Sequence, residues 1–172
     1  MTSIDTPDIA GRVITDRHTI VDLIYRYCRA MDRCDAELGY SVWHEDGEAD
    51  YGVLFKGTGR GFVDFALQAH HDFMLMHSHQ VTNIILTLDG DRASSESYAT
   101  AALRRKEGER LMQTTVRGRY LDRWSCRNGR WGIDRRIYAH DFDENHEITA
   151  TVTPGWGRRD RSDASYQVLF GV

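Results

Sequence analysis

Several common features are scarce or absent in this chain of 172 residues. It has two prolines, and its three cysteines (Cys28, Cys34 and Cys126) form no CxxC spacing. An odd number of cysteines without such spacing argues against a disulfide framework or a zinc site, so we expect reduced thiols. No apolar run approaches the roughly 20 residues that a membrane helix needs. The first 12 residues are polar and mixed in charge, unlike a secretory signal. We therefore expect a cytoplasmic protein with no membrane partner.

An excess of positive charge is also absent. The chain has 22 Lys and Arg against 26 Asp and Glu, for a net charge of −4. A surface for nucleic acid normally carries a basic excess, so we expect no nucleic-acid partner. Apolar residues make up 41% and charged residues 28%, which is typical of a globular domain. We expect one domain over residues 1–172, with its core at about 12–140 and an irregular tail over 141–172.

Helical periodicity dominates the first half. A first helix is predicted to begin near Arg17, with Asp16 as its N-cap. Its apolar stripe consists of Ile20, Leu23, Ile24, Tyr27, Cys28 and Met31. Asp35 is predicted to cap a short second helix, and a short strand and a turn follow at 48–55 and 57–59. A third helical stripe consists of Phe62, Phe65, Ala66, Ala69 and Phe73.

The second half alternates like β-structure. Strands are predicted over 81–88, 92–106, 110–125 and 131–139. They are separated by the turn sequences Asp89-Gly90-Asp91, Glu107-Gly108-Glu109 and Asn128-Gly129. Three helices followed by a long antiparallel meander indicate an α+β fold. We expect a cone-shaped, curved antiparallel sheet packed on three N-terminal helices, which close its concave side incompletely and leave a pocket.

The order of short motifs along the chain resembles a known family. The relevant segments are Tyr27–Asp32, His79–Asn83, Asp89–Asp91, Gly118–Trp124 and Asn128–Trp131. Together they resemble the SnoaL-like branch of the nuclear transport factor 2-like superfamily, over roughly residues 12–140. Members of this branch include scytalone dehydratase, hexachlorocyclohexane dehydrochlorinase and bile acid 7α-dehydratase. The resemblance implies a cystatin-like α+β barrel that binds a small hydrophobic molecule.

The resemblance also implies roles for individual residues. Asp32 and His79 match a helix aspartate and a strand histidine that pair in these enzymes, where the histidine removes a proton during elimination. Tyr51 matches a pocket tyrosine that activates the substrate oxygen, and Tyr27 resembles a second pocket tyrosine. No metal and no cofactor are implied. Because the related dehydratases are trimers and other members dimers, a homo-oligomer is expected, with a trimer ahead of a dimer.

The chemistry of the pair is also reasonable from first principles. A neutral imidazole is a good general base near pH 7, and a carboxylate on its other nitrogen fixes the tautomer. The chain has no GxSxG motif, which argues against acyl transfer. We expect a cofactor-independent lyase (dehydratase or dehydrohalogenase) or an isomerase acting on a small apolar ring compound. The alternatives are a polyketide cyclase or a non-catalytic module, such as the small subunit of a ring-hydroxylating dioxygenase.

Other interpretations of these residues remain open. Asp32 is also compatible with a solvated helix end, His79 with an ordinary strand histidine, and both tyrosines with core packing. Arg135 is expected to bind an anionic substrate group, because alternation places it on one face with Trp131, Ile133 and Ile137. A β-bulge would put Arg136 there instead, and a surface salt bridge would also account for Arg135.

Two groups of histidines invite comparison with metal sites. One group contains His70, His71, His77 and His79, and the other contains His140, Asp141, Asp143 and His146. Two histidines and a carboxylate would suit non-haem iron. The spacings match no metal signature, so we expect no bound metal.

Overall fold

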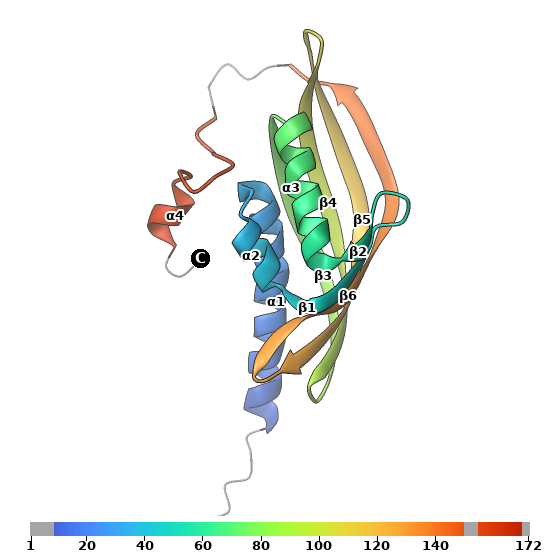
Figure 1. The fold of residues 1–172 in the computed structure, drawn as a ribbon, viewed down its shortest axis with the longest axis vertical. Coiled ribbons are helices and arrows are strands. Elements are labelled where there is room, and N and C mark those ends of the chain that lie inside the picture. The colour runs from blue at the N-terminus through green and yellow to red at the C-terminus, as the bar shows by residue number, and fades with distance from the viewer. Residues whose placement is uncertain (1–8, 150–154, 170–172) are drawn as a thin grey trace, which may run out of the picture.

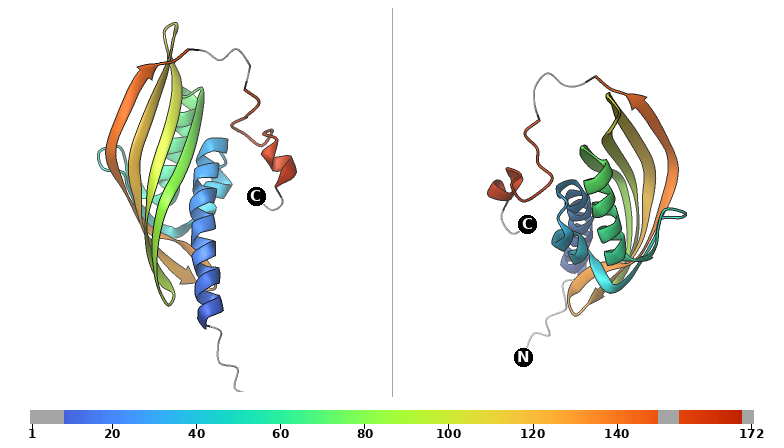
Figure 2. Two further views of the ribbon diagram at one scale, coloured as in Figure 1. Left: turned by 180° about the vertical axis from the view of Figure 1, so that it is seen from behind. Right: turned by 45° about the horizontal axis from the view of Figure 1, so that its top comes forward.

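The computed structural model describes residues 9–149 and 155–169. Six strands form one curved, open sheet in the order β2-β1-β6-β5-β4-β3, and the N-terminal helices cover its concave face (Figure 1). The views in Figure 2 show the sheet bending around α3 from two further directions. The predicted α+β fold is confirmed. One pairing is parallel rather than antiparallel, namely that of β1 with the last strand, β6.

The first helix, α1, spans Ile9–Arg33 and begins earlier than predicted. Asp16 is therefore not an N-cap but lies inside the helix. Arg12 and Asp16, one turn apart, form an ion pair of 3.3 Å, which favours continuing the helix toward the N-terminus. The Asp16 carboxylate also accepts a hydrogen bond of 2.8 Å from Nε1 of Trp131. The polar residue that resembled a cap instead joins α1 to the sheet.

The next two helices are fixed by side-chain caps. Asp35 caps α2 (Ala36–Ser41) by accepting the Leu38 N–H at 3.2 Å, as predicted. The predicted turn at 57–59 is wrong. Strand β2 (Lys56–Thr58) occupies most of it, and Thr58 then caps α3 (Gly59–Phe73) by accepting the Gly61 N–H at 3.0 Å.

The antiparallel meander is confirmed, with longer strands than predicted. Its strands are β3 (Met76–Asp89), β4 (Arg92–Glu107), β5 (Arg110–Arg127) and β6 (Arg130–Glu147). The earlier strand, β1, spans Trp43–Asp50 rather than 48–55. Strand β6 continues past residue 139 because β5 is long enough to pair with it as far as Glu147. At the last hairpin Asn128 and Gly129 both have positive φ, as the two-residue turn requires.

Two bulges in β6 decide which side chains face the helices. Across the first, Trp124 pairs with Ile133 while Arg123 pairs with Arg135, so Asp134 is the extra residue. Across the second, Gly118 lies opposite His140, and a Cβ on Gly118 would come within 2.5 Å of the Ala139 carbonyl oxygen. The first bulge shifts the inward positions of β6 by one residue.

The part of the tail that the structure describes packs against the helices. Residues 155–169 include the short helix α4 (Ser165–Val168), which lies on the side of α1 and α2 away from the sheet (Figures 1 and 2). The Tyr166 hydroxyl donates to Asp35 at 2.7 Å, and Arg29 donates to the Ser165 hydroxyl at 3.0 Å. These two bonds therefore join residues 155–169 to α1 and to the start of α2.

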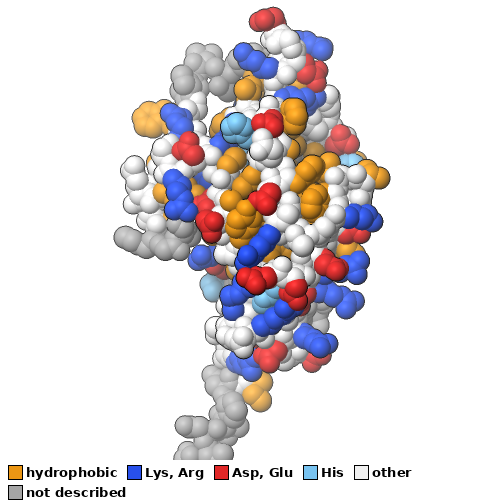
Figure 3. Space-filling model, in the orientation of Figure 1, with side chains coloured by type: hydrophobic (Ala, Val, Ile, Leu, Met, Phe, Trp, Pro, Cys, Tyr) orange, Lys and Arg blue, Asp and Glu red, His pale blue; other side chains and the backbone are white. Residues whose placement is uncertain are grey.

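The exposed surface is mixed in charge. Figure 3 shows acidic and basic side chains spread over most of one face, with hydrophobic side chains gathered near its middle, beside α3. None of the helices in the described part of the chain is long and apolar enough to traverse a bilayer.

Candidate active site

Asp32 and His79 meet where the last turn of α1 approaches the start of β3. Oδ1 of Asp32 lies 2.7 Å from Nδ1 of His79, and the same carboxylate accepts the His79 backbone N–H at 2.9 and 3.0 Å. The two side chains are only 15% and 11% exposed. The prediction that this pair lies within hydrogen-bond reach is confirmed.

The backbone contact orients the pair and sets the imidazole tautomer. An ionised carboxylate can only accept hydrogen bonds, so Nδ1 of His79 carries the proton that points toward Asp32. In the neutral form of the imidazole, the other ring nitrogen, Nε2, then has a free lone pair. Because the carboxylate also holds the backbone N–H of the same residue, the ring and strand are fixed together.

His79 borders a cavity of about 160 Å³ between the helices and the sheet. The lining is aromatic and aliphatic, with few polar groups. It consists of Tyr27, Met31, Tyr51, Leu54, Phe62, Ala66, His70, His79, Ala99, Ala101, Leu103, Val116, Tyr120 and Tyr138. Pockets for drug-sized ligands have volumes of roughly 300–1,000 Å³, so this cavity suits a ligand of about one ring.

Tyr27 and Tyr51 both line this cavity and bond to each other, with their hydroxyl oxygens 2.9 Å apart. Tyr51 stacks between Phe62 and Tyr138, at ring-centroid distances of 3.5 and 5.3 Å. Burial raises the pKa of Tyr27 and Tyr51 well above the ordinary value. Both phenols therefore stay protonated at neutral pH and can donate a hydrogen bond. The structure brings both predicted tyrosines into one cavity with His79.

The prediction for Arg135 is corrected by the first bulge in β6. Arg135 is exposed on the outer face of the sheet, and the inward position belongs to Arg136. Arg136 forms a fully buried two-pronged ion pair with Asp122, with both N–O distances at 2.7 Å. Its guanidinium also packs over the rings of Tyr27 and Tyr120, 4.3 and 4.0 Å from their centroids. Arg136 thus supports the tyrosines from behind and does not line the cavity.

Burial alone would lower the pKa of Arg136, but the Asp122 carboxylate outweighs it and raises that pKa well above the ordinary value. The Arg136 guanidinium is therefore charged at neutral pH. Sequence reasoning did not identify Asp122. The signal was the alternation along β5, which places Asp122 on the same inward face as Tyr120 and Trp124.

Two more histidines lie beside the pair. His70, from α3, lines the cavity, and its ring centroid is 5.8 Å from that of His79. His77, from β3, lies 4.1 Å from His70 between ring centroids, and its Nε2 donates to the Met31 carbonyl at 2.8 Å. Burial, and then the neighbouring imidazoles His77 and His79, lower the pKa of His70 to about 3. Burial also lowers the pKa of His77.

These histidines do not form a metal site in the structure. Among residues 9–149 and 155–169, no group of three or more His, Cys, Asp or Glu side chains is arranged to hold a metal ion. In the second sequence cluster, His140 and Asp143 are half-exposed and 3.5 Å apart, and Asp141 instead pairs with Arg119 at 3.0 Å.

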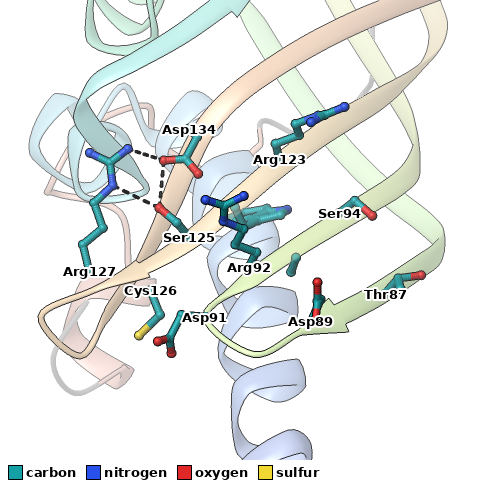
Figure 4. A pocket seen from close by; sticks show the side chains of 12 residues that line it. Thr87, Asp89, Asp91, Arg92, Ser94, Arg123, Ser125, Cys126, Arg127 and Asp134 are labelled. Carbon is teal, nitrogen blue, oxygen red and sulfur yellow. Dashed lines mark hydrogen bonds and ion pairs between the residues drawn. The ribbon is translucent and has the colours of Figure 1, made fainter.

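A larger hollow of about 700 Å³ lies at the other end of the sheet, near the β3–β4 and β5–β6 turns (Figure 4). Its lining is mostly polar and charged. Ser125 and Arg127 both bond Asp134 there, and Arg127 also donates to the Ser125 hydroxyl at 3.0 Å. None of the residues that line the aromatic cavity borders it. His79 borders the smaller, aromatic cavity and not this hollow.

A curved open sheet with helices on its concave face, and a cavity between the two, defines the nuclear transport factor 2-like fold. Residues 12–137 match the SnoaL-like domain, so the chain belongs to the SnoaL-like family. No curated protein sequence matches the chain.

Solved structures show the same fold at low identity. A protein from Novosphingobium aromaticivorans assigned as a scytalone dehydratase is 21% identical, with a TM-score of 0.71, over 83% of this chain and 95% of that one. The hexachlorocyclohexane dehydrochlorinase LinA-type3 from Novosphingobium barchaimii is 17% identical, with a TM-score of 0.72, over 82% and 97%. The beta subunit assigned to an aromatic-ring-hydroxylating dioxygenase of N. aromaticivorans is 17% identical, with a TM-score of 0.62, over 76% and 92%.

Proposed function

We propose that this protein is a cofactor-independent lyase or isomerase that uses the Asp32–His79 pair as a general base on a small ring compound. One observation carries the proposal. Nδ1 of His79 lies 2.7 Å from the Asp32 carboxylate, and the same imidazole borders an aromatic cavity of about one ring in size. The similarity in fold to a dehydratase and a dehydrochlorinase agrees with this class.

The proposed reaction begins with proton removal. Nε2 of His79 takes a proton from a ring carbon next to a carbonyl, and the C–H electron pair moves into the ring. In a lyase this pair forms a C=C bond as hydroxide or halide leaves the neighbouring carbon with its bonding electrons. In an isomerase the proton returns at a different carbon. Asp32 stabilises the imidazolium that forms, as a carboxylate does in a hydrolase triad.

In the proposed reaction, the two tyrosines donate a hydrogen bond to the substrate oxygen. Two phenols hold two O–H protons, and the single bond between Tyr27 and Tyr51 uses one of them. The guanidinium of Arg136 behind them has donors only, so it cannot accept the second proton. The spare O–H can donate to the substrate oxygen, where negative charge develops in the transition state.

The lyase proposal can be tested on 3-hydroxycyclohexanone, whose dehydration gives the conjugated product cyclohex-2-enone. Absorbance of the enone measures the rate. The wild type should accelerate its formation, and His79→Ala should lose roughly 10²–10⁴-fold of that rate, which is typical of a general base. His71→Ala is the matched control, because His71 is exposed on α3. Equal rates for wild type and His79→Ala would refute the lyase proposal.

A non-catalytic binding module is the second candidate, because a dioxygenase beta subunit shares the fold. Such a module would bind ring compounds, and His79→Ala would change only affinity. A polyketide cyclase would use the same residues on a larger substrate, but the small volume of the cavity favours a single ring.

A further inference from the structure

His70 is a second polar group in the cavity that the proposed base does not use. It lies in the last turn of α3, where its carbonyl accepts from the Met74 N–H at 3.2 Å and from Arg159 Nη1 at 2.7 Å. The residue is 9% exposed, and its side chain lines the same cavity as His79. The backbone is thus held from two sides, which fixes the position of the ring.

One ring nitrogen of His70 is buried without a partner. Nδ1 makes no hydrogen bond within the described part of the chain. A buried polar atom left unpaired costs free energy, whereas a leucine or phenylalanine at this position would not. Nδ1 of His77 is buried without a partner as well, but His77 does not line the cavity and its Nε2 is bonded to the Met31 carbonyl. His70 therefore differs from His77 in being a polar side chain on the wall of the aromatic cavity.

The charge of His70 limits which ligand group it can bind. Burial is the main reason that its pKa falls to about 3, followed by the nearby imidazoles of His77 and His79. The imidazole is therefore neutral at neutral pH, with one nitrogen that donates and one that accepts. Such a group suits an uncharged hydroxyl or carbonyl better than an anion.

We propose that His70 is a substrate-binding residue whose imidazole hydrogen-bonds an oxygen substituent of the ligand, so that the ligand is an oxygen-substituted ring, an alcohol or ketone, rather than a hydrocarbon or halocarbon. The inference rests on the proposed function for the identity of the cavity as the substrate site. Sites built to bond a hydroxyl strongly reject analogues that lack it, because their own polar groups are then left unpaired. Within the proposed class, this favours loss of water over loss of halide.

Two ligands of the same shape test the proposal. Cyclohexanone carries a ring C=O, and methylenecyclohexane carries C=CH₂ in the same place. Ligand-observed NMR titration gives the affinity for each. His70→Phe keeps an aromatic ring but removes both nitrogens, so it should weaken cyclohexanone roughly tenfold, the scale of one hydrogen bond, and leave methylenecyclohexane unchanged. His71→Phe, on the exposed side of the same helix turn, should change neither affinity.

An unchanged affinity of His70→Phe for cyclohexanone would overturn the proposal, and so would an equal loss for both ligands. Thermal melting checks that the variant is folded. If His70→Phe does not fold, His70→Leu is titrated with the same two ligands and the same result is expected.

The outcome is separable from that of the proposed function, because binding needs no proton transfer. The same titrations in His79→Ala should keep the preference for cyclohexanone that His70 provides. If the wild type shows no turnover while the effect of His70→Phe persists, the proposed function fails and the role of His70 stands. If turnover depends on His79 but His70→Phe binds cyclohexanone normally, the role of His70 fails and the proposed function stands.

Discussion

Arg136 contacts two of the tyrosines that line the cavity, Tyr27 and Tyr120. It is fully buried and packs against Tyr27 and Tyr120. Within the described residues, Asp122 is the acidic side chain that forms an ion pair with it. A buried charge that loses its partner is strongly destabilising. The Arg136–Asp122 pair therefore positions both tyrosines, and we expect the loss of Asp122 to lower the free energy of unfolding.

We predict that Asp122→Asn lowers the free energy of unfolding by roughly 3–5 kcal/mol, because it leaves the Arg136 charge uncompensated in the core. Urea denaturation measures the change. Asp141→Asn is the matched control, since it breaks an exposed pair with Arg119 on the next strand and should cost at most about 1 kcal/mol. Equal losses in the two variants would show that burial of the pair is unimportant.

Some residues of the candidate site could be predicted from the sequence and others could not. Asp32 and His79 could be paired from the motifs around them, and the pair lies where those motifs placed it. Arg135 could not be distinguished from Arg136, because one extra residue at Asp134 inverts the alternation of the strand. The cavity position of His70 depends on how α3 packs against β3, which no local pattern in the sequence specifies.

At the scale of elements, Asp35 joins three segments. The residue follows the last turn of α1, and its carboxylate caps α2 and accepts a hydrogen bond from the hydroxyl of Tyr166 in α4. Burial acts to raise the pKa of Asp35, but the hydrogen bonds from Tyr166 and from the Leu38 N–H more than offset it, so that the pKa is below the ordinary value. Ionised Asp35 therefore stabilises the folded state.

We predict that Asp35→Ala lowers the free energy of unfolding at pH 7 by about 1–2 kcal/mol, the usual cost of losing an N-cap. The folded-state pKa is depressed, so the stabilisation is present above the unfolded pKa of about 3.9 and is lost as the pH falls through the folded value. The difference in the free energy of unfolding between the wild type and Asp35→Ala should therefore become smaller as the pH falls.

Chemical denaturation at pH 7 and at successively lower pH measures both effects. Glu37→Ala, an exposed residue in the first turn of α2, is the control and should change stability little. A gap between wild type and Asp35→Ala that stays constant down to the lowest pH would contradict the assigned role.

Turn chemistry explains why the elements were largely predictable. Asn128-Gly129 and Asp89-Gly90-Asp91 fix tight hairpins, so the meander follows from local sequence. The ends of elements were less predictable, because they depend on distant partners. Strand β6 reaches Glu147 only because β5 is there to pair with it, and Asp16 lies inside α1, bonded to Trp131.

At the scale of the whole molecule, the outer face of the sheet carries apolar side chains that the helices do not cover. The exposed members are Ile85, Tyr98, Ile137 and Phe142. Apolar side chains left exposed on a sheet face are candidates for an interface between subunits. These side chains and the resemblance to trimeric dehydratases are the two grounds on which we predict a homo-oligomer.

We predict a trimer, ahead of a dimer, at micromolar concentration. Light scattering coupled to size-exclusion chromatography measures the mass, and three times the protomer mass is expected. Phe142→Asp should shift the population toward smaller species if the outer face forms the interface. A monomer mass for the wild type would contradict the prediction.

The central claim is that His79 removes a proton from a ring carbon in the cavity. Exchange of the α-hydrogens of cyclohexanone in D₂O, followed by ¹H NMR, tests this step without knowledge of the natural substrate. We expect the wild type to accelerate exchange and His79→Ala to slow it by at least about 10²-fold while cyclohexanone still binds. Exchange by folded His79→Ala at the wild-type rate would contradict the account.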